Sequence, residues 1–181
     1  MFRYIDSNRS VTWRGESSYF ADEMEYAVIS KSCLVPNLQN VAERFWQFSQ
    51  HVYANPELQS LCLSLQDKQQ RNINLLLWLS FCQQQSWTVN LEQLLAQIRD
   101  SEQKLAQFRR HRKTIKPLLS DTQYQLLLKH ELKLERRQQQ LLVCSQQRHP
   151  GKQTAQQALT AYLQQAEVAE RYLSRVSAVL V

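Results

Sequence analysis

Residues 65–82 read LQDKQQRNINLLLWLSFC, and this stretch decides the fold. Its first half is polar, whereas residues 75–82 are apolar except for one serine. Asn72 stands where a helix would begin, and its side-chain oxygen can accept a hydrogen bond from the backbone N–H of Asn74 or Leu75. The stretch therefore predicts a helix end, a turn and the start of a buried helix over residues 73–85.

Two side chains in this stretch need partners. Asp67 falls near the end of the preceding helix, where a negative charge opposes the helix dipole. Asn74 adjoins an apolar helix, and a buried amide has to be hydrogen-bonded. The favoured interpretation is a clamp between Asp67 and the start of the next helix. The alternative is a small polar binding site made of Asp67, Asn72 and Asn74.

Amphipathic periods on both sides of this stretch predict further helices. Two glycines and four prolines in 181 residues favour an all-α protein. Short connections predict antiparallel neighbours, so we expect a compact bundle of about six helices, the last three long and antiparallel. The predicted helices cover 38–53 after a cap at Asn37 or Asn40, 56–69 after Asn55, 73–85, 91 to Pro117 after Asn90, a segment from Ser120 or Asp121, and one last helix from 155 to 180.

Domain organisation follows from the same periodicity. Residues 37–181 are periodic and predict a single α-helical domain. Residues 1–36 show no sustained period and predict a poorly ordered N-terminal extension, with a partner-binding arm as the functional alternative.

Several chemistries find no support in the sequence. Two glycines cannot supply a phosphate-binding or dinucleotide loop, and the four histidines are never paired at i, i+4. We therefore expect no cofactor, no metal site and no catalytic residue. The acids of HELKLE (residues 130–135) have lysine and arginine neighbours on the same helix and predict a salt-bridged, solvent-exposed face.

Cysteine usage and hydropathy indicate the compartment. Four cysteines without CxxC spacing predict reduced thiols, and no apolar run approaches the length of a bilayer span. The N-terminus carries no apolar signal segment. A cytoplasmic protein without a membrane partner is the expectation.

One segment is strongly basic. Residues 104–116, KLAQFRRHRKTIK, contain no acid. Basic helices can contact phosphates, although cations near a helix C-terminus are favourable in any case. The segment supports a hypothesis of nucleic-acid or polyanion binding through Lys104, Arg109, Arg110, Arg112, Lys113 and Lys116.

The segment FWQFSQHVYANPELQSLCLSLQDKQQRNINLLLWLSF (residues 45–81) resembles a small all-helical family of bacterial proteins of unknown function, with the signature FWxFS…CLxLQD…NLLLWL. The turn departs from the family pattern, because Gln70 stands where glycine is usual and Asn72 where an acid is usual. The second departure argues against cation binding at the turn. The resemblance implies an all-helical fold and no activity. The residues that match are Phe45, Trp46, Phe48, Ser49, Tyr53, Cys62, Leu63, Leu65, Gln66, Asp67, Asn74, Leu75, Leu76, Leu77, Trp78 and Leu79.

These observations favour a non-enzymatic interaction or adaptor protein whose partner is another protein. Nucleic-acid or polyanion binding is the second hypothesis. A small-molecule site near Asp67 and Asn74 is the third.

Overall fold

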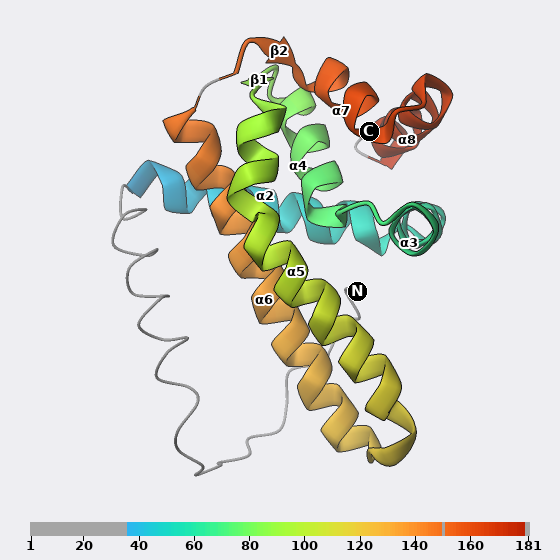
Figure 1. The fold of residues 1–181 in the computed structure, drawn as a ribbon. Coiled ribbons are helices and arrows are strands. Elements are labelled where there is room, and N and C mark those ends of the chain that lie inside the picture. The colour runs from blue at the N-terminus through green and yellow to red at the C-terminus, as the bar shows by residue number, and fades with distance from the viewer. Residues whose placement is uncertain (1–35, 150, 180–181) are drawn as a thin grey trace.

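The computed structural model describes residues 36–149 and 151–179, which form an all-α fold (Figure 1). The prediction of an all-α bundle of about six helices is confirmed. The extension predicted for residues 1–36 lies outside the described residues apart from Pro36. In chain order the elements are α2 (Pro36–Ala54), α3 (Pro56–Gln69), α4 (Ile73–Gln84), β1 (Thr88–Val89), α5 (Leu91–Ile115), the 3-10 turn η1 (Lys116–Leu118), α6 (Asp121–Arg148), β2 (Gln153–Thr154), α7 (Ala155–Leu163) and α8 (Ala166–Val179).

Helix α4 forms the core of the fold. All of its residues from Ile73 to Cys82 are buried, and it packs against α2, α3, α6 and α7. The ring of Trp78 meets that of Phe45 edge-on, with centroids 4.8 Å apart. Such edge-to-face pairs stabilise a core beyond the area they bury. The apolar run of residues 75–82 is thus part of a helix that is buried on every side.

Local capping sets the helix starts. Asn55, Asn72, Asn90 and Ser120 each accept hydrogen bonds from the first turn of the helix that follows, as predicted. The predicted caps Asn37 and Asn40 are wrong, because α2 already begins at Pro36 and both asparagines lie inside it.

Helices α5 and α6 form a long antiparallel hairpin. They contain 25 and 28 residues and are joined by η1. Pro117 lies in this turn, in agreement with its predicted role of ending the helix. Figure 1 shows the turn end of the hairpin reaching beyond the other labelled helices.

The single last helix predicted for residues 155–180 is wrong in one respect. The chain breaks into α7 and α8, and Gln164 between them adopts the left-handed conformation with φ 59°. Helix α7 packs against α4, whereas α8 packs against α3 and α7. A heptad pattern continues across such a break because each helix buries its own stripe, so the pattern alone could not locate the change of direction.

Replacing Gln164 by glycine is expected to raise the free energy of unfolding by up to about 1 kcal/mol, because glycine adopts positive φ without a steric penalty. The matched control Ala161→Gly lies inside α7 and is expected to lower it by about 1 kcal/mol. Urea unfolding followed by circular dichroism measures both. A decrease for Gln164→Gly would show that α7 and α8 are not separated by a left-handed residue.

A short antiparallel ladder that the sequence did not predict joins two connections. Thr88 pairs with Thr154 and Val89 with Gln153. Gly151 lies so close to the backbone of Val89 that any Cβ at this position would collide with it. One of the two glycines of the chain is therefore required by close backbone approach.

The cysteine prediction holds in part. Cys62 and Cys82 are buried free thiols, and burial raises the pKa of Cys62 to about 12. Cys144 is disulfide-bonded, so the prediction of a reduced thiol is wrong there. Cys33 lies outside the described residues. Among the described residues, none of the helices combines the length and the hydropathy that crossing a membrane requires.

Candidate functional site

Asn72 connects three elements at the start of α4. Its side-chain oxygen accepts from the backbone N–H of Leu75 at 2.9 Å, which confirms the predicted cap. Its own backbone N–H donates to the hydroxyl of Tyr162 on α7 at 2.7 Å. Its side-chain nitrogen donates to Gln138 of α6 and to Glu102 of α5. The turn before α4 is thus held by both long helices and by α7.

Gln138 is the centre of a buried polar network. Its Oε1 accepts from the amide nitrogens of Asn72 and Asn74, each at 2.9 Å. Its Nε2 donates to Ser101 at 3.0 Å and to Glu102 at 3.2 Å. We refer to this set, completed by two residues on the α2 side, as the amide network: Ser49, Asn72, Asn74, Ser101, Glu102, Gln138 and Gln139.

Asn74 is satisfied by α6. Its Nδ2 donates to Gln138, and its Oδ1 accepts from Nε2 of Gln139 at 3.0 Å. Gln139 also donates to Ser49 of α2 at 3.2 Å. Among the described residues, Oε1 of Gln139 is the one buried amide atom of the network without a hydrogen-bond partner. This pairing of α4 with α6 supplies the hydrogen bonds that the buried amide of Asn74 requires.

Glu102 is the titratable member of the amide network. Burial raises its pKa, while the hydrogen bond from Gln138 and the charge of Arg109 act in the opposite direction. The net direction is upward, so the carboxyl group is protonated more easily than an exposed glutamate.

A second buried cluster lies farther along the hairpin. Arg109 donates to Glu131 at 3.1 Å and to Glu135 at 2.7 Å, and Arg112 donates to Glu131 at 2.5 Å and to the hydroxyl of Tyr124. Glu131, Glu135 and Arg112 are 2%, 3% and 4% exposed. We call these five residues the ion cluster. Burial alone would lower the pKa of Arg109, but Glu135 and Glu131 raise it, and the net direction is upward.

The ion cluster corrects the prediction for HELKLE. Glu131 and Glu135 do not lie on a solvent-exposed face and do not pair with lysines of their own helix. They point toward α5 and pair with its arginines. The ring of His130 on the same helix packs against the ring of Phe108, with centroids 5.2 Å apart.

The bases of the predicted polyanion-binding segment fall into two groups, one in the ion cluster and one exposed to solvent. Arg112 is buried in the ion cluster, and the side chain of Arg109 is only 15% exposed. Lys104, Arg110, Lys113 and Lys116 are exposed. Lys116 lies over the ring of Tyr124, 5.2 Å from its centroid.

Asp67 lies apart from the amide network. Its carboxylate pairs with Lys113 at 3.5 Å, and the two side chains are 60% and 64% exposed. The structure therefore brings Asn72 and Asn74 together on Gln138 and leaves Asp67 at the surface. The partner of Asp67 is α5, whereas the clamp hypothesis placed that partner at the start of α4.

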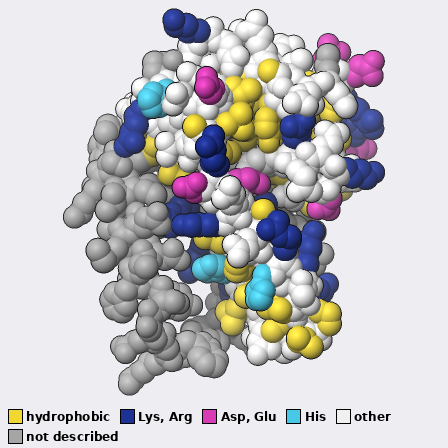
Figure 2. Space-filling view, viewed as in Figure 1, with side chains coloured by type: hydrophobic (Ala, Val, Ile, Leu, Met, Phe, Trp, Pro, Cys, Tyr) yellow, Lys and Arg dark blue, Asp and Glu magenta, His cyan; other side chains and the backbone are white. Residues whose placement is uncertain are grey.

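The turn end of the hairpin exposes apolar side chains. Leu118 in η1 is 83% exposed and Leu126 on α6 is 52% exposed. Figure 2 shows hydrophobic side chains gathered at this end, with histidine and basic side chains beside them. We call residues 116–126 the hairpin tip. This exposed tip was not predicted, although KPLLS (residues 116–120) places two leucines beside a proline turn.

A regular spacing could also have revealed the polar residues of α6. Leu128, Glu131, Glu135, Gln138 and Leu142 follow one another at three or four residues and are all buried. Polar residues in register with an apolar stripe lie on the buried face of a helix. Within the described ranges, no group of three or more histidine, cysteine or acidic side chains is placed to hold a metal ion.

Comparison with known proteins identifies a family and nothing finer. A family model described as "Protein of unknown function (DUF2390)" matches residues 44–142, more than half of the chain. The match spans the amide network, the ion cluster and the hairpin tip. No curated protein and no solved structure matches the chain.

Proposed function

Since the chain belongs to the DUF2390 family of proteins of unknown function, we propose from its own geometry that it is a non-enzymatic interaction protein acting through the α5–α6 hairpin. The observation that carries this proposal is the exposure of Leu118 and Leu126 at the hairpin tip. Exposed apolar groups gathered at one place mark interaction sites in soluble proteins. The sequence favoured a protein as the partner.

The buried polar residues support the same proposal. The amide network and the ion cluster join α2, α4, α5 and α6 through side chains that bond one another. Such cross-helix bonds orient the hairpin relative to α4, and this rigidity lowers the entropic cost of docking. A cytoplasmic location belongs to the proposal; the free thiols of Cys62 and Cys82 support it, whereas the disulfide bond of Cys144 argues against it.

Photo-cross-linking in the native cell tests the proposal. With p-benzoylphenylalanine in place of Leu118, we expect a specific covalent adduct to a protein or a lipid. The same group in place of Lys152, an exposed residue beside β2, is the control and is expected to give none. If position 118 yields no more adduct than position 152, the hairpin is not the contact element.

Polyanion binding is the second proposal. It now involves fewer residues than predicted, because Arg109 and Arg112 belong to the ion cluster. Lys104, Arg110, Lys113 and Lys116 are exposed on α5 or in η1, and this supports it. Heparin retention lost in Arg110→Gln/Lys113→Gln, with normal binding in Leu118→Ser, would favour it over the docking proposal. The small-molecule hypothesis needs Asp67 and Asn74 on one accessible surface, and Asn74 is 3% exposed.

A further inference from the structure

The hairpin tip combines apolar exposure with a surplus of positive charge. Between residues 110 and 133, the exposed charged side chains are one acid, Asp121, and five bases. Among the described residues, Lys113 is the one of these five bases that forms an ion pair, and its partner is the exposed Asp67. The five bases are Arg110, Lys113, Lys116, Lys129 and Lys133.

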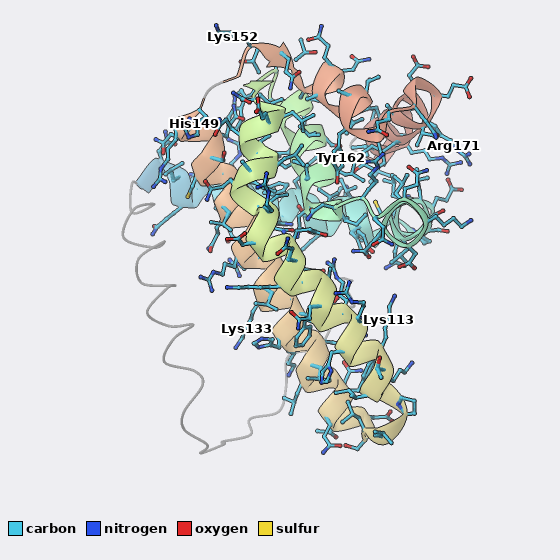
Figure 3. All side chains as sticks on the ribbon, viewed as in Figure 1. Lys113, Lys133, His149, Lys152, Tyr162 and Arg171 are labelled. Atoms are coloured by element: carbon cyan, nitrogen blue, oxygen red, sulfur yellow. The ribbon has the colours of Figure 1, made fainter. Side chains whose placement is uncertain are left out.

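These cations surround the hairpin. Arg110 and Lys113 belong to α5, whereas Lys129 and Lys133 belong to α6. Figure 3 shows Lys113 and Lys133 on opposite sides of the hairpin. A flat nucleic-acid or protein partner lying along one side would meet only part of this charge. A surface perpendicular to the hairpin axis would meet the cations of both helices at once.

The spacing along the axis matches the depth of a membrane interface. An α-helix rises about 1.5 Å per residue, so Lys113 lies about 3 Å from the end of α5 at Ile115, and Lys129 lies about 12 Å from the start of α6 at Asp121. Amphipathic elements enter the headgroup region by about 5–10 Å. With Leu118 at that depth, these lysines reach the level of lipid phosphates, where long side chains place their charge in the polar layer.

We infer that the hairpin tip docks on an anionic membrane surface, with Leu118 and Leu126 entering the interface and the surrounding lysines contacting the headgroups. This inference rests on the proposed function, because it names what the tip contacts. Nucleic acid would contact the cations but would leave the apolar side chains of Leu118 and Leu126 exposed to water. A second copy of the chain would bring like charges together.

The inference differs from the expectation that a membrane is not a partner. That expectation came from the lack of a segment long and apolar enough to cross a membrane. Crossing a membrane and binding to its surface require different sequence features. Surface binding requires only a few apolar groups together with cations.

Sedimentation of the full chain with vesicles tests the inference. We expect binding to mixed phosphatidylcholine–phosphatidylglycerol vesicles and little binding to pure phosphatidylcholine. Leu118→Ser/Leu126→Ser is expected to weaken binding about tenfold or more, and Lys116→Gln/Lys129→Gln by a similar factor. Leu95→Ser, 39% exposed on α5 outside the tip, and Arg148→Gln/Lys152→Gln are the matched controls and are expected to bind normally.

The outcomes separate this inference from the proposed function. Thermal unfolding by circular dichroism establishes that each variant is folded. No binding to anionic vesicles, or binding that the leucine variant leaves unchanged, overturns the membrane inference. If position 118 then still cross-links to a protein in the cell, the proposed function stands with a protein partner. If it cross-links to nothing, both fail.

Discussion

Replacing Glu131 by alanine is expected to lower the free energy of unfolding by about 3–5 kcal/mol, because it leaves Arg112 buried without its carboxylate. Arg112 is 4% exposed and bonds Glu131 at 2.5 Å. Arg109 also loses one of its two acidic partners. Urea unfolding followed by circular dichroism measures the change.

Two variants control this prediction. Asp67→Ala removes the exposed pair with Lys113 and is expected to cost less than about 1 kcal/mol, because exposed ion pairs are screened by solvent. The double variant Arg112→Met/Glu131→Leu removes both buried charges and is expected to recover much of the loss. A loss below about 1 kcal/mol in Glu131→Ala would mean that the acids of HELKLE face the solvent.

This result also affects how polyanion binding is tested. Neutralising the whole basic segment would remove Arg109 and Arg112, which belong to the ion cluster. If such a variant lost heparin retention, the cause would be the destabilised hairpin and not the loss of a binding surface. Only substitutions at exposed bases, such as Arg110 and Lys113, separate binding from folding.

Replacing Gln138 by leucine is expected to lower the free energy of unfolding by about 2–4 kcal/mol. Leucine has a similar volume but accepts no hydrogen bond, so the amide nitrogen of Asn74 loses its acceptor and that of Asn72 loses one of two. A buried donor left unsatisfied costs about 1–3 kcal/mol. Chemical denaturation measures the loss.

The control for Gln138→Leu is Gln147→Leu, an exposed position on the same helix, where we expect a change within about 0.5 kcal/mol. Equal effects of the two substitutions would contradict the central place of Gln138 in the amide network. The double variant Asn74→Leu/Gln138→Leu removes one orphaned donor together with its acceptor and is expected to be less destabilised than the sum of its single variants.

Local features of this protein could be predicted because their causes are local. An N-cap bonds a backbone N–H two or three residues away, so Asn55, Asn72 and Asn90 were identified from their neighbours alone. The burial of α4 followed equally from a run too apolar to face water.

The functional features depended on contacts between distant residues. Gln138 is 64 residues from Asn74, and Arg109 is 22 residues from Glu131. Polar side chains look alike in sequence whether they face water or one another, so Glu131 and Glu135 were predicted to face the solvent. The break at Gln164 was missed because heptad spacing continued across it.

The sequence by itself determined an all-α protein, where most of its helices begin, and which helix is buried on all sides, because capping and hydrophobic burial act through near neighbours and composition. Only the tertiary structure decided which charged side chains are buried and which residues they pair with. The antiparallel pairing of α5 with α6 turns Arg109 and Arg112 inward against Glu131 and Glu135, and leaves Leu118 exposed at the turn. The rotation of one helix against another settles which polar residues meet, and that rotation depends on packing across the whole bundle.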